Sequence, residues 1–483
     1  MDFQRVDELH DIGYNRTLSM MDSIKSRIHR RVNLDNIRLR RMVYRSNYPE
    51  LRFKNIIIDG ANTQQQAYIK KEFHKSDNKE FSYEDLKQGY FRLLSDNMIS
   101  EIIPHAIYNP EDDTYDLHLK VKLENNFAVR LGGNISTSNS NQIYLGLSYQ
   151  DLNYYAKEFV FDGQLGKVYN NAQFMAKIDF STAIPTSYRF IASISTFDYF
   201  KKDKLFSRND KPAFNQKDER FLKLQVGLPF LSSKRAEFGI GIARIEDKYF
   251  QKSVIDFGND KFDKSRYDLF GGSISFNGST LNSRQYPTRG YREALIAQIF
   301  IGRERFYPGE GATGNNNKEH HSWLQLSYMK EKYHNMSEHW VLGWYLKALY
   351  ASKNFSENYT ATMMQAGEFS PTQHSKLTYN EAFRANQFVG AGIRPIYRLN
   401  QMFHLRGEFY GFMPIYPIER NSLNKAYYGK AFSKFEYLGE ISVVCQLPFG
   451  DISAYVNHYS SPKREWNVGL SIGWQLFNYR FIE

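Results

Sequence analysis

Hydrophobic and polar residues alternate with a period of two along most of the chain after residue 126. In "QIYLGLSY" the apolar face carries Ile143, Leu145 and Leu147, and residues 237–245 repeat the pattern. Strict alternation is typical of β-strands with one apolar face. About sixteen such segments follow one another, and their other faces carry Gly, Ser, Gln, Lys and Asp, which suits a wet or filled barrel interior better than a dry sandwich core.

The connections between these segments give an independent prediction. Counting strands from Phe127, the long polar links all follow odd-numbered strands, and they lie at about 200–217, 251–265, 303–319, 351–386 and 415–432. The links after even-numbered strands are expected to be short. Bacterial outer-membrane barrels have short periplasmic turns and long external loops, and an even strand count returns both ends to the periplasm. Residues 126–483 are therefore predicted to form a transmembrane β-barrel of about 16 strands.

The last alternating segment contains a pattern that suggests a different function. "GLSIG" at 469–473 fits the G-x-S-x-G of a hydrolase nucleophile elbow, and Asp59 in "DGA" offers an acidic partner. However, the alternation passes straight through Ser471, which predicts a strand rather than a sharp strand-to-helix turn. By phase Ser471 faces the interior, with His458 as the nearest histidine. No catalytic site is predicted in this chain.

The same segment carries two tryptophans on its apolar face. Trp466 and Trp474 are separated by roughly 20 Å along the membrane normal if the strand continues through Leu476. That distance matches the height of the apolar band between the aromatic girdles of an outer-membrane barrel. A sandwich strand with two core tryptophans is the alternative.

Composition agrees with a barrel. The chain of 483 residues is 42% hydrophobic and 16% aromatic, and it contains no run of about 18 apolar residues that would form a membrane-spanning helix. Its single cysteine, Cys445, leaves no internal disulfide. By phase Cys445 faces lipid beside Ile441 and Val443, as an inert apolar residue.

The pattern changes ahead of the barrel. "LRFKNIIIDGAN" predicts a strand, "TQQQAYIKKEFH" a helix, and "SYEDLKQGYFRLLSDN" a second helix capped by Ser82. "MISEIIPHAIYN" and "DTYDLHLKVKLEN" predict two further strands. This β-α-α-β-β order predicts a small α+β domain over residues 51–125, and residues 1–45 are expected to form a basic linker helix.

These features together resemble a known superfamily. A β-α-α-β-β module followed by about sixteen amphipathic strands is similar to a POTRA domain joined to a barrel of the BamA and two-partner-secretion superfamily. The most specific match is "SRQYPTRGYREALI", in which Pro287, Thr288, Arg289 and Gly290 form the Pro-Thr-Arg-Gly turn of those barrels. The closing "WNVGLSIGWQLFNYRFIE" resembles their terminal strand. The resemblance implies a barrel in the bacterial outer membrane with its POTRA domain in the periplasm.

The first 45 residues carry a second resemblance. "HDIGYNRTLSMMDSIKSRIHRRV" is similar to the tail helix of the patatin-like phospholipase domain in barrel-bearing patatins of Bacteroidetes type. This resemblance implies that the chain is the carboxy-terminal part of a longer protein, in which the POTRA domain and barrel anchor or translocate a phospholipase passenger. The alternative is an outer-membrane assembly factor of BamA type.

The chain departs from the superfamily in the loop after the eleventh strand. The superfamily carries a V-R-G-Y-like motif there, whereas residues 351–386 contain no Arg-Gly pair. Arg384 is the nearest candidate for a lumen-anchoring arginine, and Glu408 or Glu440 on inward strand faces are its expected partners. A solvated loop arginine is the alternative.

The charge balance bears on partners. The 63 Lys and Arg exceed the 52 Asp and Glu, most densely in residues 25–45, which lack the aromatic platform of a nucleic-acid site. Nucleic acid is therefore not an expected partner, whereas outer-membrane lipid is, and "KKDK" at 201–204 suits lipopolysaccharide phosphates. POTRA edge strands bind extended chains by strand addition, so unfolded polypeptide or the protein's own passenger is a further expected partner. A homo-oligomer is compatible with the sequence.

Cofactor and metal signals are weak. His320 and His321 are adjacent in a predicted outer loop, without ligand spacing. "GEGATG" at 309–314 lacks the Lys-Ser/Thr pair and the strand-helix context of a phosphate-binding loop. The sequence predicts no cofactor and no metal.

Overall fold

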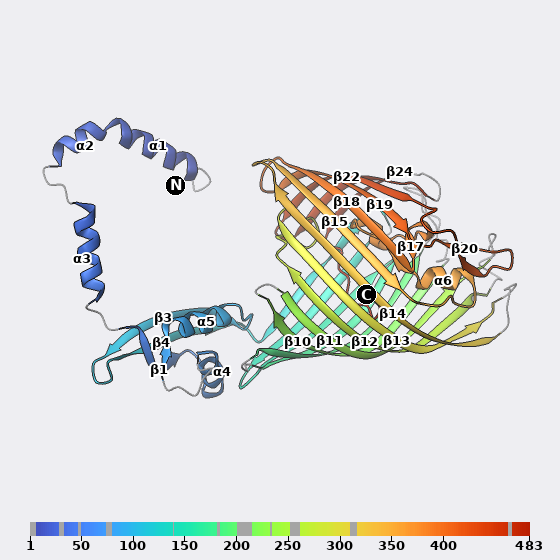
Figure 1. The fold of residues 1–483 in the computed structure, drawn as a ribbon, viewed down its shortest axis with the longest axis horizontal. Helices are drawn as coiled ribbons and strands as arrows, with labels where there is room; N and C mark the ends of the chain where they lie inside the picture. Colours follow the sequence, from blue (N-terminus) through green and yellow to red (C-terminus); the bar gives the residue numbers. More distant parts are fainter. Residues whose placement is uncertain are drawn as a thin grey trace.

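The barrel expected from the alternation is present. The computed structural model describes residues 6–28, 33–46, 50–73, 80–138, 140–180, 184–199, 215–231, 234–251, 261–309, 316–461 and 466–483. The chain forms a closed, 16-stranded antiparallel barrel preceded by a small α+β domain (Figure 1). The fold class predicted from the sequence is confirmed.

The barrel strands follow chain order around the wall, and the last strand closes on the first. They are β5 (Phe127–Ser136), β6 (Gln142–Leu152), β7 (Ala156–Gly166), β8 (Tyr169–Phe180), β9 (Thr186–Tyr199), β10 (Asn215–Phe230), β11 (Lys234–Tyr249), β12 (Asp263–Ser279), β13 (Gly290–Tyr307), β14 (Asn317–Asn335), β15 (Trp340–Ala351), β18 (Gln387–Arg398), β19 (Phe403–Pro414), β22 (Glu436–Leu447), β23 (Gly450–Tyr459) and β24 (Trp466–Gly473).

Exposure alternates along most of the strands as the pattern requires, although the first five residues of β5 are all exposed. In β10, Leu222 and Leu224 are 45% and 55% exposed, whereas Phe221 and Lys223 are 4% and 5% exposed. The outward face is therefore apolar and faces lipid, and the inward face mixes polar and apolar groups. An even number of antiparallel strands with an apolar outer belt is the architecture of bacterial outer-membrane barrels. We place the barrel in that membrane on this ground.

The predicted parity of the connections is confirmed at the long links, which follow the fifth, seventh, ninth, eleventh and thirteenth strands. These links mark the external end of the barrel. The prediction that every even-to-odd turn is short is wrong at residues 280–289, between β12 and β13. This segment folds into the periplasmic end of the barrel.

The small domain has the predicted order with one added short strand. It comprises β1 (Arg52–Asp59), α4 (Thr63–Phe73), β2 (Phe81–Ser82), α5 (Tyr83–Leu94), β3 (Ile99–Asn109) and β4 (Thr114–Leu123). Its sheet has the order β2-β1-β4-β3, which leaves β3 at an edge. Phe53, Ile69, Leu93, Leu117 and Leu119 are each at most 2% exposed and form its core. Asp59 ends β1 at the turn made by Gly60, which has a φ of +87°.

The segment before this domain forms three helices, so the single linker helix predicted for residues 1–45 is wrong. They are α1 (Val6–Ser19), α2 (Met21–Arg27) and α3 (Leu34–Ser46). Their apolar side chains are exposed, for example Leu9 at 56% and Leu39 at 62%. Among the described residues, no helix has the length and apolarity needed to cross a membrane.

Candidate functional site in the filled lumen and at the strand seam

Three segments that belong to no barrel strand fill the lumen. They are residues 352–386 after β15, the turn 280–289, and residues 474–483 after β24. Hydrogen bonds join the segments to the wall and to one another. The candidate site is this filling together with the seam where β24 meets β5.

The loop 352–386 is folded in itself. It contains α6 (Tyr359–Gln365), β16 (Gly367–Glu368), the 3₁₀ turns η2 (His374–Leu377) and η3 (Glu381–Phe383), and β17 (Arg384–Ala385). The hairpin β20 (Ile418–Arg420) and β21 (Ala426–Tyr428) from a later loop packs beside α6. Figure 1 shows α6 and β20 at the end of the barrel away from the small domain.

Arg384 is buried and holds this loop together. Its guanidinium donates to the carboxylate of Glu368 at 2.9 Å and to the carbonyl oxygen of Ala366 at 3.2 Å. The expected ion pairs with Glu408 or Glu440 are therefore wrong, as is the alternative of a solvated arginine. The reason is the β16–β17 pairing, which puts Glu368 directly opposite Arg384. No sequence pattern signals that register.

The tip of the loop is held by a histidine. His374 Nδ1 lies 2.9 Å from a carboxylate oxygen of Glu440 on β22, and both side chains are at most 4% exposed. The His374 ring stacks on Tyr455 of β23. Arg394 of β18 donates to the carbonyl oxygen of Pro371 at 3.2 Å. Glu440 thus does bind the loop, but through a histidine that the sequence analysis did not single out.

Glu408 belongs to a second buried cluster on the same wall. Arg406 and Tyr410 both donate to its carboxylate, Tyr410 at 2.5 Å. Arg394 lies 3.8 Å from the same carboxylate and also pairs with Glu331 of β14. A buried carboxylate with this many donors holds the side chains around it in place.

The Pro-Thr-Arg-Gly turn is tied to that cluster. The carbonyl oxygen of Pro287 accepts from Arg406 at 2.8 Å. Asn282 closes the turn, because its side-chain oxygen accepts from the backbone N–H of Thr288 and of Arg289. Gly290 has a φ of +93°, and a Cβ there would lie 2.1 Å from the carbonyl oxygen of Thr280. The motif therefore needs its glycine to turn the chain from the lumen into β13, while Arg289 stays exposed.

Gln285 joins all three lumen segments. Its side chain donates to the carbonyl oxygen of Gly473 at 3.3 Å and accepts from the backbone N–H of Gln475 at 3.0 Å. Its own carbonyl oxygen accepts from Gln373 at 2.8 Å. The turn 280–289, the loop tip and the end of β24 therefore meet at one residue.

The strand predicted to run through Trp474 and Leu476 ends at Gly473, which has a φ of +112°. The chain then crosses the lumen. Asn478 bonds to Asn171 at 2.6 Å, and the backbone N–H of Phe481 bonds to Glu219 at 2.7 Å. The Phe481 ring packs into an apolar cluster on the inner wall. This path is a correction of the prediction, and it means that Trp474 does not continue the outer girdle from Trp466.

The turn at Gly473 leaves the barrel seam short. β24 pairs with β5 at three positions, Ser471 with Ser136, Ile472 with Ile135, and Gly473 with Asn134. By contrast, β5 pairs with β6 from Phe127 to Asn134. The carbonyl oxygen of Gly133 still accepts from the backbone N–H of Trp474 at 2.7 Å, and within the described residues the other edge of β5 from Phe127 to Gly132 has no strand partner. Such an edge presents unpaired backbone N–H and C=O groups to an added strand.

Ser471 lies at this seam and not in a hydrolase site. Its hydroxyl donates to the side-chain oxygen of Asn134 at 2.6 Å, and Ser453 is its register partner on β23. His458 pairs with Trp466 and stacks on its ring at 4.7 Å. Asp59 lies in the separate small domain. The three residues of the hydrolase hypothesis are therefore not brought together.

One group on the inner wall offers metal-ligand geometry that the sequence analysis missed. Glu304, Glu319 and His321 place one donor atom each within 4.8 Å of one another. Glu304 is the register partner of Glu319 across β13 and β14. His321 lies 2.9 Å from Glu304 and is buried. The "KKDK" stretch and most of "GEGATG" lie outside the described residues.

The closed barrel, the inserted loop and the turn beside a short seam define an outer-membrane barrel with the BamA-like fold. The structure is similar to BamA from Haemophilus ducreyi lacking POTRA domains 1–3, with a TM-score of 0.60 and 12% identity over 88% of this chain and 84% of that chain. It is also similar to CdiB from Acinetobacter baumannii, with a TM-score of 0.50 and 8% identity over 88% of this chain and 74% of that chain. No known family profile and no curated protein matches the sequence.

Proposed function

We propose that this protein inserts or passes polypeptide at the outer membrane through the seam between β24 and β5. The short pairing at that seam is the observation that carries the proposal. An extended chain that pairs with Phe127–Gly132 would satisfy the backbone groups that β24 leaves free. The BamA and CdiB structures to which the fold is similar support the same general class, secretion or assembly.

The small domain supplies a second surface of the same kind. β3 pairs with β4 along one edge, and its side chains from Ile103 to Tyr108 are exposed. An extended polypeptide would add to the free edge of β3 before reaching the seam. Pro104 lacks an N–H, so strand addition is expected toward the Tyr108 end.

A disulfide across the seam tests the proposal. Ser136 and Ser471 are register partners, at the spacing a disulfide needs, and Cys445→Ser removes the native thiol. In liposomes, S136C/S471C is expected to stop assembly of an unfolded barrel substrate under oxidising conditions and to recover with reductant, scored by heat-modifiable mobility.

The control pair is Q173C/S193C, which joins the continuously paired strands β8 and β9. It is expected to retain activity when oxidised. Full activity of the oxidised seam variant would contradict the proposal.

The second candidate function is to tether or translocate a patatin-like phospholipase passenger. The exposed apolar side chains of α1 and α3, such as Ile12 at 56% and Met42 at 69%, favour it, because a neighbouring folded domain would cover them. The intact mass and amino-terminal peptide of the protein from native outer membranes test it. A longer chain with an upstream G-x-S-x-G supports the passenger, and a chain that begins near Met1 would contradict it.

A further inference from the structure

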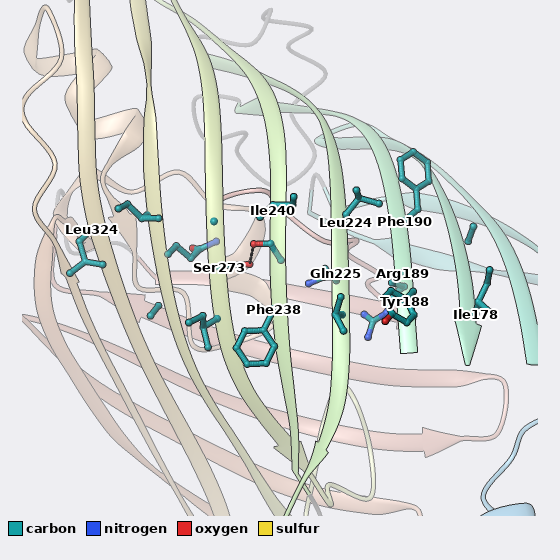
Figure 2. Close-up of a pocket in the computed structure, with 18 residues that line it drawn as sticks. Ile178, Tyr188, Arg189, Phe190, Leu224, Gln225, Phe238, Ile240, Ser273 and Leu324 are labelled. Carbon is teal, nitrogen blue, oxygen red and sulfur yellow. Dashed lines mark hydrogen bonds between the residues drawn. The ribbon is translucent and has the colours of Figure 1, made fainter. Parts of the chain in front are cut away.

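The outer wall of the barrel carries an apolar hollow of about 830 Å³ on the strands from β8 to β14. Figure 2 shows its side chains on adjacent strands, with Leu224, Ile240 and Leu324 among them. Register places these three in one row across the wall together with Gly272 and Ile299. The hollow therefore follows one row of register partners across the lipid-facing surface.

The hollow exists because small residues lie between large apolar side chains on the outward face. Gly272 has no side chain where its neighbours project, and a Cβ there would meet within 4 Å only Ile299, at 3.4 Å. Ala297, in the next row toward the periplasm, is small as well. Phe238 and its register partner Val226 also line the hollow. The space is long, apolar and open to the membrane. A hydrocarbon chain would therefore fit it in both shape and polarity.

A row of basic residues crosses the same strands on the external side of the hollow. Arg220, Arg244, Asp268, Arg303 and His320 are successive register partners from β10 to β14. The row lies near the strand ends that carry the long links, so it is at the level of the external leaflet. Arg220, Arg244 and Arg303 are exposed.

The next row toward the outside adds three further cations, Arg266, Arg305 and Lys318, and two carboxylates, Glu246 and Asp218. Asp218 of β10 is the register partner of Glu246, so across both rows five arginines and one lysine stand beside three carboxylates.

The carboxylates are already engaged. Asp268 contacts Arg244 at 2.7 Å, Glu246 contacts Arg266 at 3.6 Å, and Asp218 contacts Lys248 at 3.1 Å. Within the part of the chain that the structure describes, Arg220 and Arg303 have no ion-pair partner. This surplus of positive charge on an outward face suits an anionic ligand.

The basic row and the hollow are correctly spaced for one amphiphile. Arg244 lies four positions along β11 from Ile240, which corresponds to about 13 Å along the strand and about 10 Å along the membrane normal at a usual tilt. A lipid with phosphate at the basic row would thus place an acyl chain in the hollow. Arginine is well suited to binding the phosphate, because its planar guanidinium can form two parallel hydrogen bonds with it.

We propose that this face of the barrel binds a phosphorylated, multiply acylated glycolipid of the external leaflet, with its phosphates on the basic row and one acyl chain in the hollow at Gly272. The site is independent of the polypeptide-handling function proposed above. It lies on the outer wall of β8 to β14, whereas the seam is formed by β24 and β5. A lipid held there would fix the tilt and depth of the barrel in the membrane.

The test uses the full chain in detergent and native mass spectrometry. The probes are lipid A with both phosphates, lipid A from which the phosphates have been removed, and a zwitterionic phospholipid. Arg220→Ser/Arg303→Ser removes two unpaired cations, and Gly272→Leu fills the hollow. The control, Lys330→Ser/Lys332→Ser, removes two outward cations from the periplasmic end of β14. Heat-modifiable mobility verifies that each variant is folded.

The wild type is expected to retain phosphorylated lipid A in preference to both other probes. The double arginine variant should bind phosphorylated lipid A about tenfold more weakly, since it loses charge-assisted hydrogen bonds, and the control should match the wild type. Gly272→Leu should weaken both forms of lipid A. Equal binding of the dephosphorylated form, or wild-type binding by the arginine variant, would overturn the proposal. A dimer that Gly272→Leu dissociates would assign the hollow to a second copy of the chain instead.

Discussion

Single buried side chains determine how the lumen filling is attached to the wall. Glu408 is the clearest case, since Arg406, Arg394 and Tyr410 converge on its carboxylate. Through Arg406 it also holds the carbonyl oxygen of Pro287. A substitution of Glu408 is therefore expected to disturb contacts both in the barrel wall and in the turn 280–289.

We expect Glu408→Gln to lower the free energy of unfolding by about 3 kcal/mol, because removing one partner leaves buried cations without compensation. Urea unfolding of the purified protein in lipid, followed by tryptophan fluorescence, measures the change. Glu338→Gln, at an exposed turn position, is the matched control and should change little. Equal stability of the two variants would show that the cluster does not hold the wall.

Gly290 gives a second residue-level prediction. Gly290→Ala forces a Cβ against the carbonyl oxygen of Thr280 at a φ of +93°, so a loss of about 1–3 kcal/mol is expected in the same unfolding experiment. Gly163→Ala is the control, because a Cβ there meets its nearest atom at 3.8 Å. A loss at Gly163 as large as that at Gly290 would rule out the strained turn as the cause.

At the scale of elements, α5 of the small domain depends on its cap. The Ser82 hydroxyl accepts from the backbone N–H of Asp85, and the Asp85 carboxylate accepts from the backbone N–H of Ser82. The backbone hydrogen bond from Ser82 is the main cause of the lowered pKa of Asp85, and the Ser82 hydroxyl adds to it. Because the folded-state pKa is lowered, this stabilisation is present above the unfolded pKa of about 3.9 and is lost as pH falls through the folded value.

Ser82→Ala is therefore expected to cost about 1 kcal/mol at neutral pH and less in acid below the folded pKa of Asp85. Hydrogen-exchange protection of residues 83–94, compared with wild type at each pH, measures this. Ser100→Ala, on an exposed position of β3, should leave α5 unchanged. A penalty that does not diminish in acid would contradict the role of the Asp85 carboxylate.

Elements formed by local pattern were predictable, and elements that end or turn for tertiary reasons were not. Alternation alone placed the first barrel strand at Phe127, where β5 begins. The same alternation wrongly extended the last strand past Gly473, since Trp474 and Leu476 keep the period although the backbone turns inward. The inward fold of residues 280–289 was missed because its contacts, such as that of Pro287 with Arg406, lie far apart in sequence.

At the scale of the whole molecule, the lumen is filled by segments of the same chain that hold one another in place through hydrogen bonds. Residues 474–483 form the tail of the chain. Gln285 links this tail to the loop tip, and Phe481 of the tail packs with Phe221 and Phe300 of the inner wall. Polar inward faces in the sequence predicted a wet or filled interior without distinguishing the two. That choice depends on side chains from distant segments meeting inside the barrel, which a period-two pattern does not encode.

The loop 352–386 and the tail 474–483 are expected to block the channel redundantly. Arg480 of the tail lies 3.9 Å from Glu368 of the loop, but the loop is also held to the wall by His374–Glu440, a contact in which the tail takes no part. Removal of residues 474–483 alone should therefore leave conductance in planar bilayers low. Removing the tail and also replacing residues 355–384 with a short Gly-Ser linker should open the aqueous channel of a barrel of this size.

Single-channel recording of the wild type, both single deletions and the double deletion makes the comparison, with heat-modifiable mobility as the check of folding. Conductance near the wild-type value in the double deletion would mean that the turn 280–289 alone seals the barrel, because Arg406 still holds Pro287 in that variant. Full opening by loss of the tail alone would mean that the loop leaves the lumen with it. The redundant arrangement requires that only the double deletion conducts freely.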